Sequence, residues 1–203
     1  MTAAPADPRV RCGWIDQSRL SAADFELYRE YHDTEWGRPL RDSAALFERV
    51  SLEAFQSGLS WLIILRKRDN FRAAFDGFEV ERIARYTDRD VERLMADPGI
   101  VRNRAKIDAT IANARVAADM ADAGDDLGEL LWSFAPPDRV TRVRPASMSE
   151  IAAVTPESKA MAKELKKRGF RFVGPTTAYA LMQATGMVDD HVANCWVPRA
   201  DGG

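Results

Sequence analysis

Apolar residues recur at helical spacing through almost the whole of this chain, and no stretch of five or more residues alternates as a half-buried strand would. Leu46, Phe47 and Val50 form one such stripe, and Asp42 with Ser43 supplies the cap expected at a helix N-terminus. The pattern therefore predicts an all-α fold. We expect its helices over residues 21–32, 42–57, 61–75, 87–95, 103–123, 129–134, 156–168 and 175–186, with the proline-bearing stretch 135–147 as a surface loop.

The length of 203 residues allows one large domain or two small lobes around a hydrophobic core. We expect a single compact unit of two lobes over residues 10–197 that works as a monomer, with flexible tails at 1–9 and 198–203. The formal net charge of −2 means that any surface for a polyanion has to be local.

No apolar run is long enough to span a bilayer, and the N-terminal MTAAPADPRV lacks the basic start and apolar core of a signal peptide. The only two cysteines lie at opposite ends of the chain, and in a reducing compartment a structural disulfide between them is not expected. These features predict a cytoplasmic protein with no membrane partner.

The two cysteines and the two histidines of the chain together make a Cys2His2 set, which is a complete tetrahedral shell for zinc. His191 and Cys195 are four residues apart, so they would share one face of the short helix expected there. Cys12 lies just before the first predicted helix and His32 lies at its end, a spacing unlike that of a zinc finger. The alternative is that His191 is a core or capping residue and Cys195 a small buried hydrophobe.

The stretch SLEAFQSGLSW, residues 51–61, holds an acid, a glycine turn, an apolar tip and an indole. Glu53 falls beside the apolar stripe, where a carboxylate is partly desolvated and needs a hydrogen-bonding or charged partner. A Ser-Gly pair ends the predicted helix directly before Leu59 and Trp61. Two interpretations stay open from these residues alone: a functional site, or a helix end packed by Trp61 with Glu53 paired to an arginine.

A helix–turn–helix unit near the C-terminus is centred on the turn GFRFVGPTTA, residues 169–178. Such a turn exposes backbone N–H groups at the start of its second helix, and these groups suit a phosphate. Two more basic clusters lie at residues 66–68 and 102–106, and although each alone could be a solvated helix face, together they favour a local basic surface. The residues of the unit expected to grip DNA are Lys166, Lys167, Arg168, Gly169, Arg171 and Gly174.

Six motifs follow one another along the chain: CGW (12–14), YHDTEWG (31–37), LEAFQSGLSW (52–61), LWSF (131–134), LKKRGFRFVGPTTAYALMQATG (165–186) and DDHVANC (189–195). Together they resemble the DNA-3-methyladenine glycosylase I family of the helix-hairpin-helix superfamily, over roughly residues 11–196. The resemblance implies a monofunctional base-excision repair hydrolase. Such an enzyme cuts the N-glycosidic bond of 3-methyladenine in alkylated double-stranded DNA, releases the free base and leaves an abasic site.

The resemblance also implies the architecture: a helix-hairpin-helix bundle with one structural zinc in a lobe that joins the two chain ends. Carried over by motif, the zinc ligands are Cys12, His32, His191 and Cys195. The catalytic residue that contacts the base is Glu53, and the base-binding residues are Tyr31, Trp61, Trp14 and Trp36. Leu59, beside Gly58, would fill the gap left in the DNA.

The family pattern leads us to expect a polar residue at position 55, where this chain carries Phe55. The residues at the rim of the pocket are therefore not predicted. The competing hypothesis is a non-enzymatic, zinc-containing DNA-binding protein that uses the same hairpin, but such a protein needs no acidic aromatic pocket. A helical protein-interaction module would leave the cysteine and histidine set unexplained.

Many helix-hairpin-helix glycosylases carry a catalytic aspartate shortly after the second hairpin helix, and VDDH (188–191) is similar to that position. The glycosylase I family is understood to act without this aspartate. We therefore expect Asp189 or Asp190 to be an N-cap of the following helix rather than a catalytic group.

Overall fold

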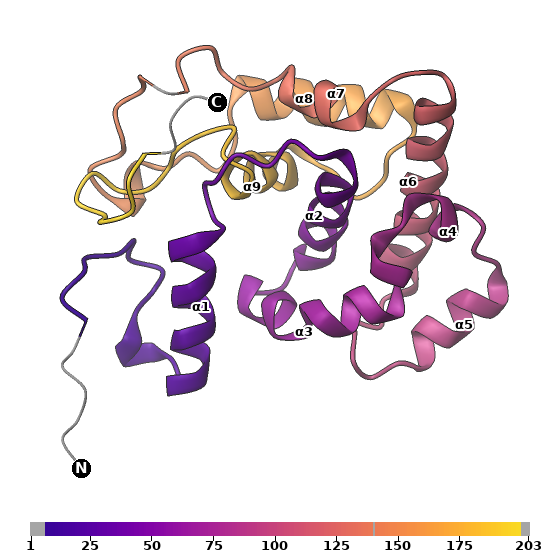
Figure 1. The fold of residues 1–203 in the computed structure, drawn as a ribbon, viewed down its shortest axis with the longest axis horizontal. Helices are drawn as coiled ribbons and strands as arrows, with labels where there is room; N and C mark the ends of the chain where they lie inside the picture. The colour runs from indigo at the N-terminus through magenta and orange to yellow at the C-terminus, as the bar shows by residue number, and fades with distance from the viewer. Residues whose placement is uncertain (1–6, 140, 200–203) are drawn as a thin grey trace.

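The computed structural model describes residues 7–139 and 141–199, and every regular element in these ranges is helical (Figure 1). The α-helices are α1 (Ala22–Thr34), α2 (Ser43–Gln56), α3 (Trp61–Ala74), α4 (Val80–Ala84), α5 (Asp88–Ala96), α6 (Arg104–Asp122), α7 (Leu127–Trp132), α8 (Pro156–Arg168) and α9 (Pro175–Ala184). Single 3-10 turns occur at η1 (Gln17–Arg19), η2 (Asp76–Phe78) and η3 (Met148–Glu150). The all-α prediction is confirmed, and the expected flexible tails lie partly outside the described residues.

The helix boundaries follow the capping residues closely. The Asp42 side chain accepts from Ala45 N at 2.9 Å, and Thr87 forms the expected capping box of α5. At the other end of α8, Gly169 has the left-handed φ of +105° that a glycine adopts without steric cost. Short α4 was not predicted, because five residues are too few to show a helical period.

The prediction of a short helix around residues 191–195 is wrong, since this segment forms irregular turns. Cys195 N donates to Val192 O at 2.9 Å in one local turn, while other backbone N–H groups in and beside this segment bond to distant parts of the chain. Ala193 N donates to Pro145 O at 2.8 Å and Trp196 N donates to Val10 O at 2.9 Å. These long-range bonds replace the helical ladder.

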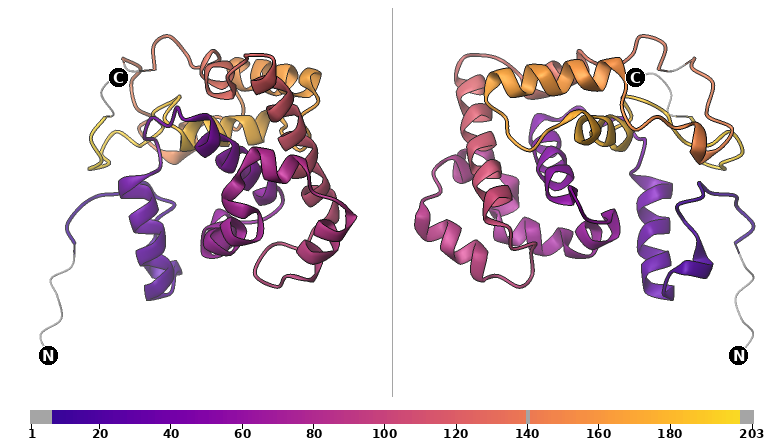
Figure 2. Two further views of the ribbon diagram at one scale, coloured as in Figure 1. Left: turned by 45° about the vertical axis from the view of Figure 1, so that its right-hand side comes forward. Right: turned by 180° about the vertical axis from the view of Figure 1, so that it is seen from behind.

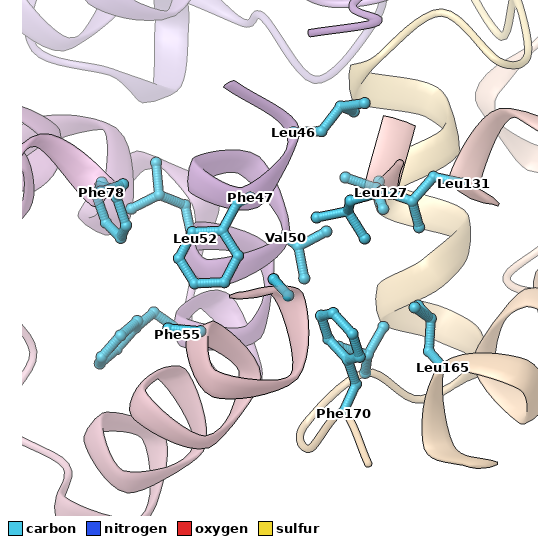
Figure 3. Close-up of a cluster of buried hydrophobic side chains, with 14 of the residues drawn as sticks. Leu46, Phe47, Val50, Leu52, Phe55, Phe78, Leu127, Leu131, Leu165 and Phe170 are labelled. Carbon is cyan, nitrogen blue, oxygen red and sulfur yellow. The ribbon is translucent and has the colours of Figure 1, made fainter. Parts of the chain in front are cut away.

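Helix α2 is the centre of the fold and packs against α3, α6, α7 and α9 (Figure 1). Its side chains Leu46, Phe47 and Val50 are fully buried among residues of these neighbours (Figure 3). Phe55 also points into this core, with its ring 4.7 Å from that of Phe71. The departure from the family pattern at Phe55 therefore affects core packing and not the pocket rim.

A second, smaller cluster of buried side chains brings the two ends of the described chain together. It contains Cys12 and Tyr31 from the N-terminal part and Val192, Cys195 and Val197 from the C-terminal part. Figure 2 shows the corresponding segments, indigo and yellow, on the same side of the molecule. Within residues 7–139 and 141–199, no helix combines the length and apolar character needed to cross a membrane.

Candidate active site

A cavity of about 280 Å³ opens between α1, α2, α3, α9 and the N-terminal segment. This volume is near the lower end of the range for small-molecule sites, about 300–1,000 Å³, and suits a single base. The structure brings together all five residues predicted for the pocket, which are Trp14, Tyr31, Trp36, Glu53 and Trp61. The lining residues not predicted are Tyr28, Gln56, Met148, Ala180 and Gln183.

Glu53 lies on α2 with only 5% of its surface exposed. Within the described residues its carboxylate has no hydrogen-bond donor, so the expected alternative of an arginine-paired Glu53 is not what the structure contains. Burial raises the pKa of Glu53 to about 7, and the nearby charge of Arg49 opposes this shift. The carboxylate therefore has unused capacity for hydrogen bonds and charge, directed at the cavity.

The aromatic residues form a wall around this carboxylate. The rings of Tyr31 and Trp61 lie 5.4 Å apart and tilted, and Trp14 makes edge contacts with Tyr28 at 5.3 Å and Trp36 at 5.4 Å. Burial raises the pKa of the Tyr31 hydroxyl, so it stays protonated at neutral pH. Aromatic faces attract cations through their quadrupole. A cavity with an acid and several rings therefore favours a flat cationic ligand.

The turn after α2 projects a side chain beside the cavity. Gly58 has a left-handed φ of +80°, and the Leu59 side chain that follows is 37% exposed. A second hollow, of about 240 Å³, connects this turn and Glu53 with Thr176 and Thr177 at the start of α9. The predicted apolar tip and the predicted hairpin therefore border the same face as the base-sized cavity.

Lys106 is bound to the backbone of this turn within the protein. Its predicted place in the basic surface cluster at residues 102–106 is therefore wrong. Its Nζ is buried and donates to Phe55 O at 2.8 Å and Ser57 O at 2.5 Å, two carbonyls at the end of α2. The cluster 66–68 is likewise bound within the protein, since Arg66 pairs with Asp24 and Arg68 with Glu35. Sequence spacing could not show that these cations are already paired within the protein.

The hairpin between α8 and α9 presents its backbone outward. Asn113 anchors it by accepting from Arg171 N at 2.7 Å and donating to Arg171 O at 3.1 Å. A Cβ placed on Gly174 would meet nothing within 4 Å, so the backbone there borders open space. Phe172, which sequence reasoning did not single out, is 43% exposed at a left-handed φ of +58°.

The predicted basic residues of the hairpin differ in their availability. Lys166, Lys167 and Arg171 are exposed, and Gly169 lies at the surface. Arg168 is instead held by two carboxylates, at 2.9 Å from Glu164 and 2.8 Å from Asp125. Its guanidinium is therefore already paired within the protein.

Cys12, His32, His191 and Cys195 meet in one buried cluster, with ligand atoms all within 4.8 Å of one another. Three Sγ-to-nitrogen separations are 3.5 Å: Cys12 to His191, Cys195 to His191 and Cys195 to His32. Bonds of about 2.0–2.3 Å to a tetrahedral ion imply ligand separations of about 3.3–3.8 Å. The described arrangement therefore fits a metal ion.

The outer ring nitrogens of both histidines are engaged in the way that metal-bound histidines require. Nδ1 of His32 lies 2.8 Å from Asp33 Oδ1, and Nε2 of His191 lies 3.2 Å from Trp36 O. Each imidazole is thus oriented with its other nitrogen toward the cysteines. Both cysteines are free thiols, as expected.

Asp189 and Asp190 lie near this cluster but away from the cavity lining. Asp189 pairs with Arg144 at 2.8 Å and accepts from His191 N at 3.3 Å. Asp190 accepts from Tyr179 Oη at 2.6 Å and from Gln183 Nε2 at 2.8 Å. The expectation that one of them caps a helix is wrong, because no helix begins there, but both have structural partners.

Comparison with known proteins gives a consistent result. The family model described as methyladenine glycosylase matches residues 21–198. DNA-3-methyladenine glycosylase 1 of Escherichia coli (strain K12) is 46% identical over 186 residues, covering 91% of this chain and 95% of that protein. A crystal structure of 3-methyladenine DNA glycosylase I is 45% identical with a TM-score of 0.83, covering 92% of this chain and 98% of that chain.

A further solved structure, of a 3-methyladenine DNA glycosylase I variant in complex with 3-methyladenine, is 35% identical with a TM-score of 0.80. It covers 86% of this chain and 94% of that chain. These matches extend over most of the chain, and they are consistent with the helical fold and the acidic aromatic cavity. The chain therefore belongs to the methyladenine glycosylase family.

Proposed function

We propose that this protein is a DNA glycosylase that hydrolyses the N-glycosidic bond of 3-methyladenine in alkylated DNA and leaves an abasic site. The observation that carries the proposal is the buried, unpartnered carboxylate of Glu53 facing a base-sized aromatic cavity. The related glycosylases are named for the same lesion, 3-methyladenine. A protein that only binds DNA has no use for such a cavity.

Recognition rests on the charge of the damaged base. Alkylation at N3 makes the adenine cationic, and the faces of Tyr31 and Trp61 attract a cation more strongly in a desolvated site. The Glu53 carboxylate adds a negative charge and accepts a hydrogen bond from the base edge. Trp14 and Trp36 complete the wall. A normal, neutral adenine gains less from each of these contacts.

The chemistry needs little acid catalysis, because the cationic base is already a good leaving group. The C1′–N9 bond breaks and its electron pair neutralises the ring. Water then adds to C1′ and loses a proton. The protein supplies the extraction of the base from the stack, which costs a few kcal/mol, and a pocket that stabilises the extruded cation.

Contacts to the DNA would come from the face that holds the hairpin and the turn after α2. Leu59, beside Gly58, would occupy the space left by the extruded base. The backbone around Gly174 would accept a phosphate, and the exposed Lys166 and Lys167 would add non-specific attraction. We propose that the working unit is a monomer.

The cysteine and histidine cluster is proposed to hold one structural zinc. Cys12 and His32 would bind it from the N-terminal part and His191 and Cys195 from the C-terminal part. Zinc supplies binding free energy to folding rather than chemistry here, because four protein ligands leave no coordination position for water or substrate. Elemental analysis of protein purified under metal-replete conditions, with one zinc per chain expected, tests this; no bound metal would contradict it.

The proposed activity is tested by incubating duplex DNA treated with a methylating agent with the purified protein and detecting the released bases. We expect 3-methyladenine to be released. Trp61→Ala weakens binding of free 3-methyladenine by about 1–3 kcal/mol, the range for base–aromatic stacking. Tight binding to damaged duplex without any released base would instead support the non-enzymatic DNA-binding hypothesis.

A further inference from the structure

Arg49 lies on α2 one turn before Glu53 and is nearly buried, with 9% of its surface exposed. It does not line the cavity but lies behind the cavity wall. Its guanidinium carbon is 5.4 Å from the ring centroid of Tyr31 and 5.5 Å from that of Trp61. A buried cation behind a pocket for a cation needs a reason.

The hydrogen bond between Arg49 and Tyr31 has only one possible polarity. Arg49 Nη1 lies 3.0 Å from Tyr31 Oη, and a guanidinium can only donate. The Tyr31 hydroxyl must therefore accept, which directs its own proton elsewhere. Across the described residues no acceptor receives that proton, and the side chain lines the cavity. The hydroxyl is thus available as a donor to a ligand in the cavity.

The ionised Glu53 can only accept, so Tyr31 and Glu53 together offer one donor and one acceptor, beside other polar lining residues such as Gln56 and Gln183. Adenine carries a matching pair on one edge, since N7 accepts and the N6 amino group donates. Guanine carries two acceptors there, N7 and O6, and its O6 would face a carboxylate with no proton to share.

Resting on the proposed function, we propose that Arg49 is a positioning residue that fixes the Tyr31 hydroxyl as a donor and so makes the pocket select alkylated adenine over alkylated guanine. Without the guanidinium, the hydroxyl can rotate and offer a lone pair to the cavity instead of its proton. The adenine match is then lost for part of the time.

The surroundings explain how the charge of Arg49 is tolerated and why it can be removed. Arg49 Nη2 lies 3.4 Å from Glu35 Oε2, so a carboxylate offsets the cation behind the rings. Arg68 donates to both oxygens of Glu35, at 2.6 and 2.8 Å. Replacing Arg49 therefore leaves Glu35 paired. Methionine in its place retains an unbranched apolar stem and removes the donors together with the positive charge.

The experiment compares the full-length protein with Arg49→Met, Tyr31→Phe and the double variant. Binding of free 3-methyladenine is measured by calorimetry, and release of 3-methyladenine and 3-methylguanine is measured from the same methylated duplex. Arg72→Met is the matched control, because it also breaks an arginine pair between α3 and α2, with Glu48, but lies away from Tyr31. A melting curve of each variant confirms folding.

We expect Arg49→Met to weaken binding of 3-methyladenine about fivefold, equivalent to one ordinary hydrogen bond. The ratio of released 3-methyladenine to 3-methylguanine falls by a similar factor, and Arg72→Met changes neither. In the Tyr31→Phe background, Arg49→Met causes no further loss, because the hydroxyl it acts through is gone.

Unchanged binding and an unchanged release ratio in folded Arg49→Met would overturn the inference. So would losses from Arg49→Met and Tyr31→Phe that multiply in the double variant, since that result would make Arg49 act independently of the hydroxyl. If the parent protein releases no 3-methyladenine at all, the proposed function fails instead, and the two failures are thereby distinguished.

Discussion

Replacing Glu53 with glutamine is expected to stabilise the fold while weakening the proposed base binding. The folded protein raises the pKa of Glu53 from 4.5 to about 7 because the carboxylate is buried. The unfolded chain ionises it at the ordinary value, so between these two pH values the folded state holds a proton that the unfolded state has lost. Ionisation then favours unfolding, and stability falls as the pH rises through this window.

The size of the effect follows from the two pKa values. Each pKa unit corresponds to about 1.36 kcal/mol. The destabilisation by Glu53 is about 1 kcal/mol at pH 5.5 and about 3 kcal/mol at pH 8, where it is nearly complete. Glutamine does not titrate, so Glu53→Gln removes the pH-dependent cost. The stability gain of the variant is therefore about 2 kcal/mol larger at pH 8 than at pH 5.5.

The assay is urea unfolding of the parent protein and Glu53→Gln at both pH values, followed by circular dichroism. The difference between the two proteins at one pH contains any change in packing or hydrogen bonding, and the difference of those differences isolates the titration of Glu53. All other titrating groups are shared. Equal stability differences at pH 5.5 and 8 would show that Glu53 has an ordinary pKa and that its carboxylate is solvated.

Three further predictions concern the surroundings of the cavity. Asp189→Asn retains most of the single-turnover release rate of 3-methyladenine, since Asp189 pairs with Arg144 and does not line the cavity; a hundredfold loss in a folded variant, about 3 kcal/mol, would make it catalytic. Lys106→Met removes two hydrogen bonds to backbone carbonyls at the end of α2 and destabilises the protein by about 2–4 kcal/mol, measured by urea unfolding, and a loss within about 0.5 kcal/mol would show that these bonds are exchanged for water. The double charge reversal Lys166→Glu with Lys167→Glu weakens binding to an abasic duplex and flattens its salt dependence, whereas unchanged affinity across salt concentrations would make these lysines a solvated helix face.

Local patterns predicted the helices well, because capping and periodicity are short-range properties. Asp42, Thr87 and Gly169 mark helix ends in the sequence and occupy those positions in the structure. The segment around His191 was predicted wrongly because its backbone bonds to distant residues such as Pro145, and no local pattern shows such a partner.

The pocket residues were predicted through motifs, but their environment was not. The identity of Glu53 and Tyr31 was available from the sequence, whereas the absence of a donor to Glu53 within the described chain depends on how four helices meet. The inward direction of Lys106 also depends on the packing of α6 against α2. A basic residue at a helix start can lie on either face, and sequence spacing alone does not distinguish a DNA contact from a buried brace.

The pairing of the two ends of the described chain has a consequence for synthesis. The wall formed by Trp14 and Tyr31 leaves the ribosome well before Val192 and Cys195, yet it packs in one cluster with them. Translation of more than 150 residues therefore separates the two halves of this cluster. We expect a nascent or truncated chain that stops before Val192 and Cys195 to lack a closed pocket, so that it cannot capture a base.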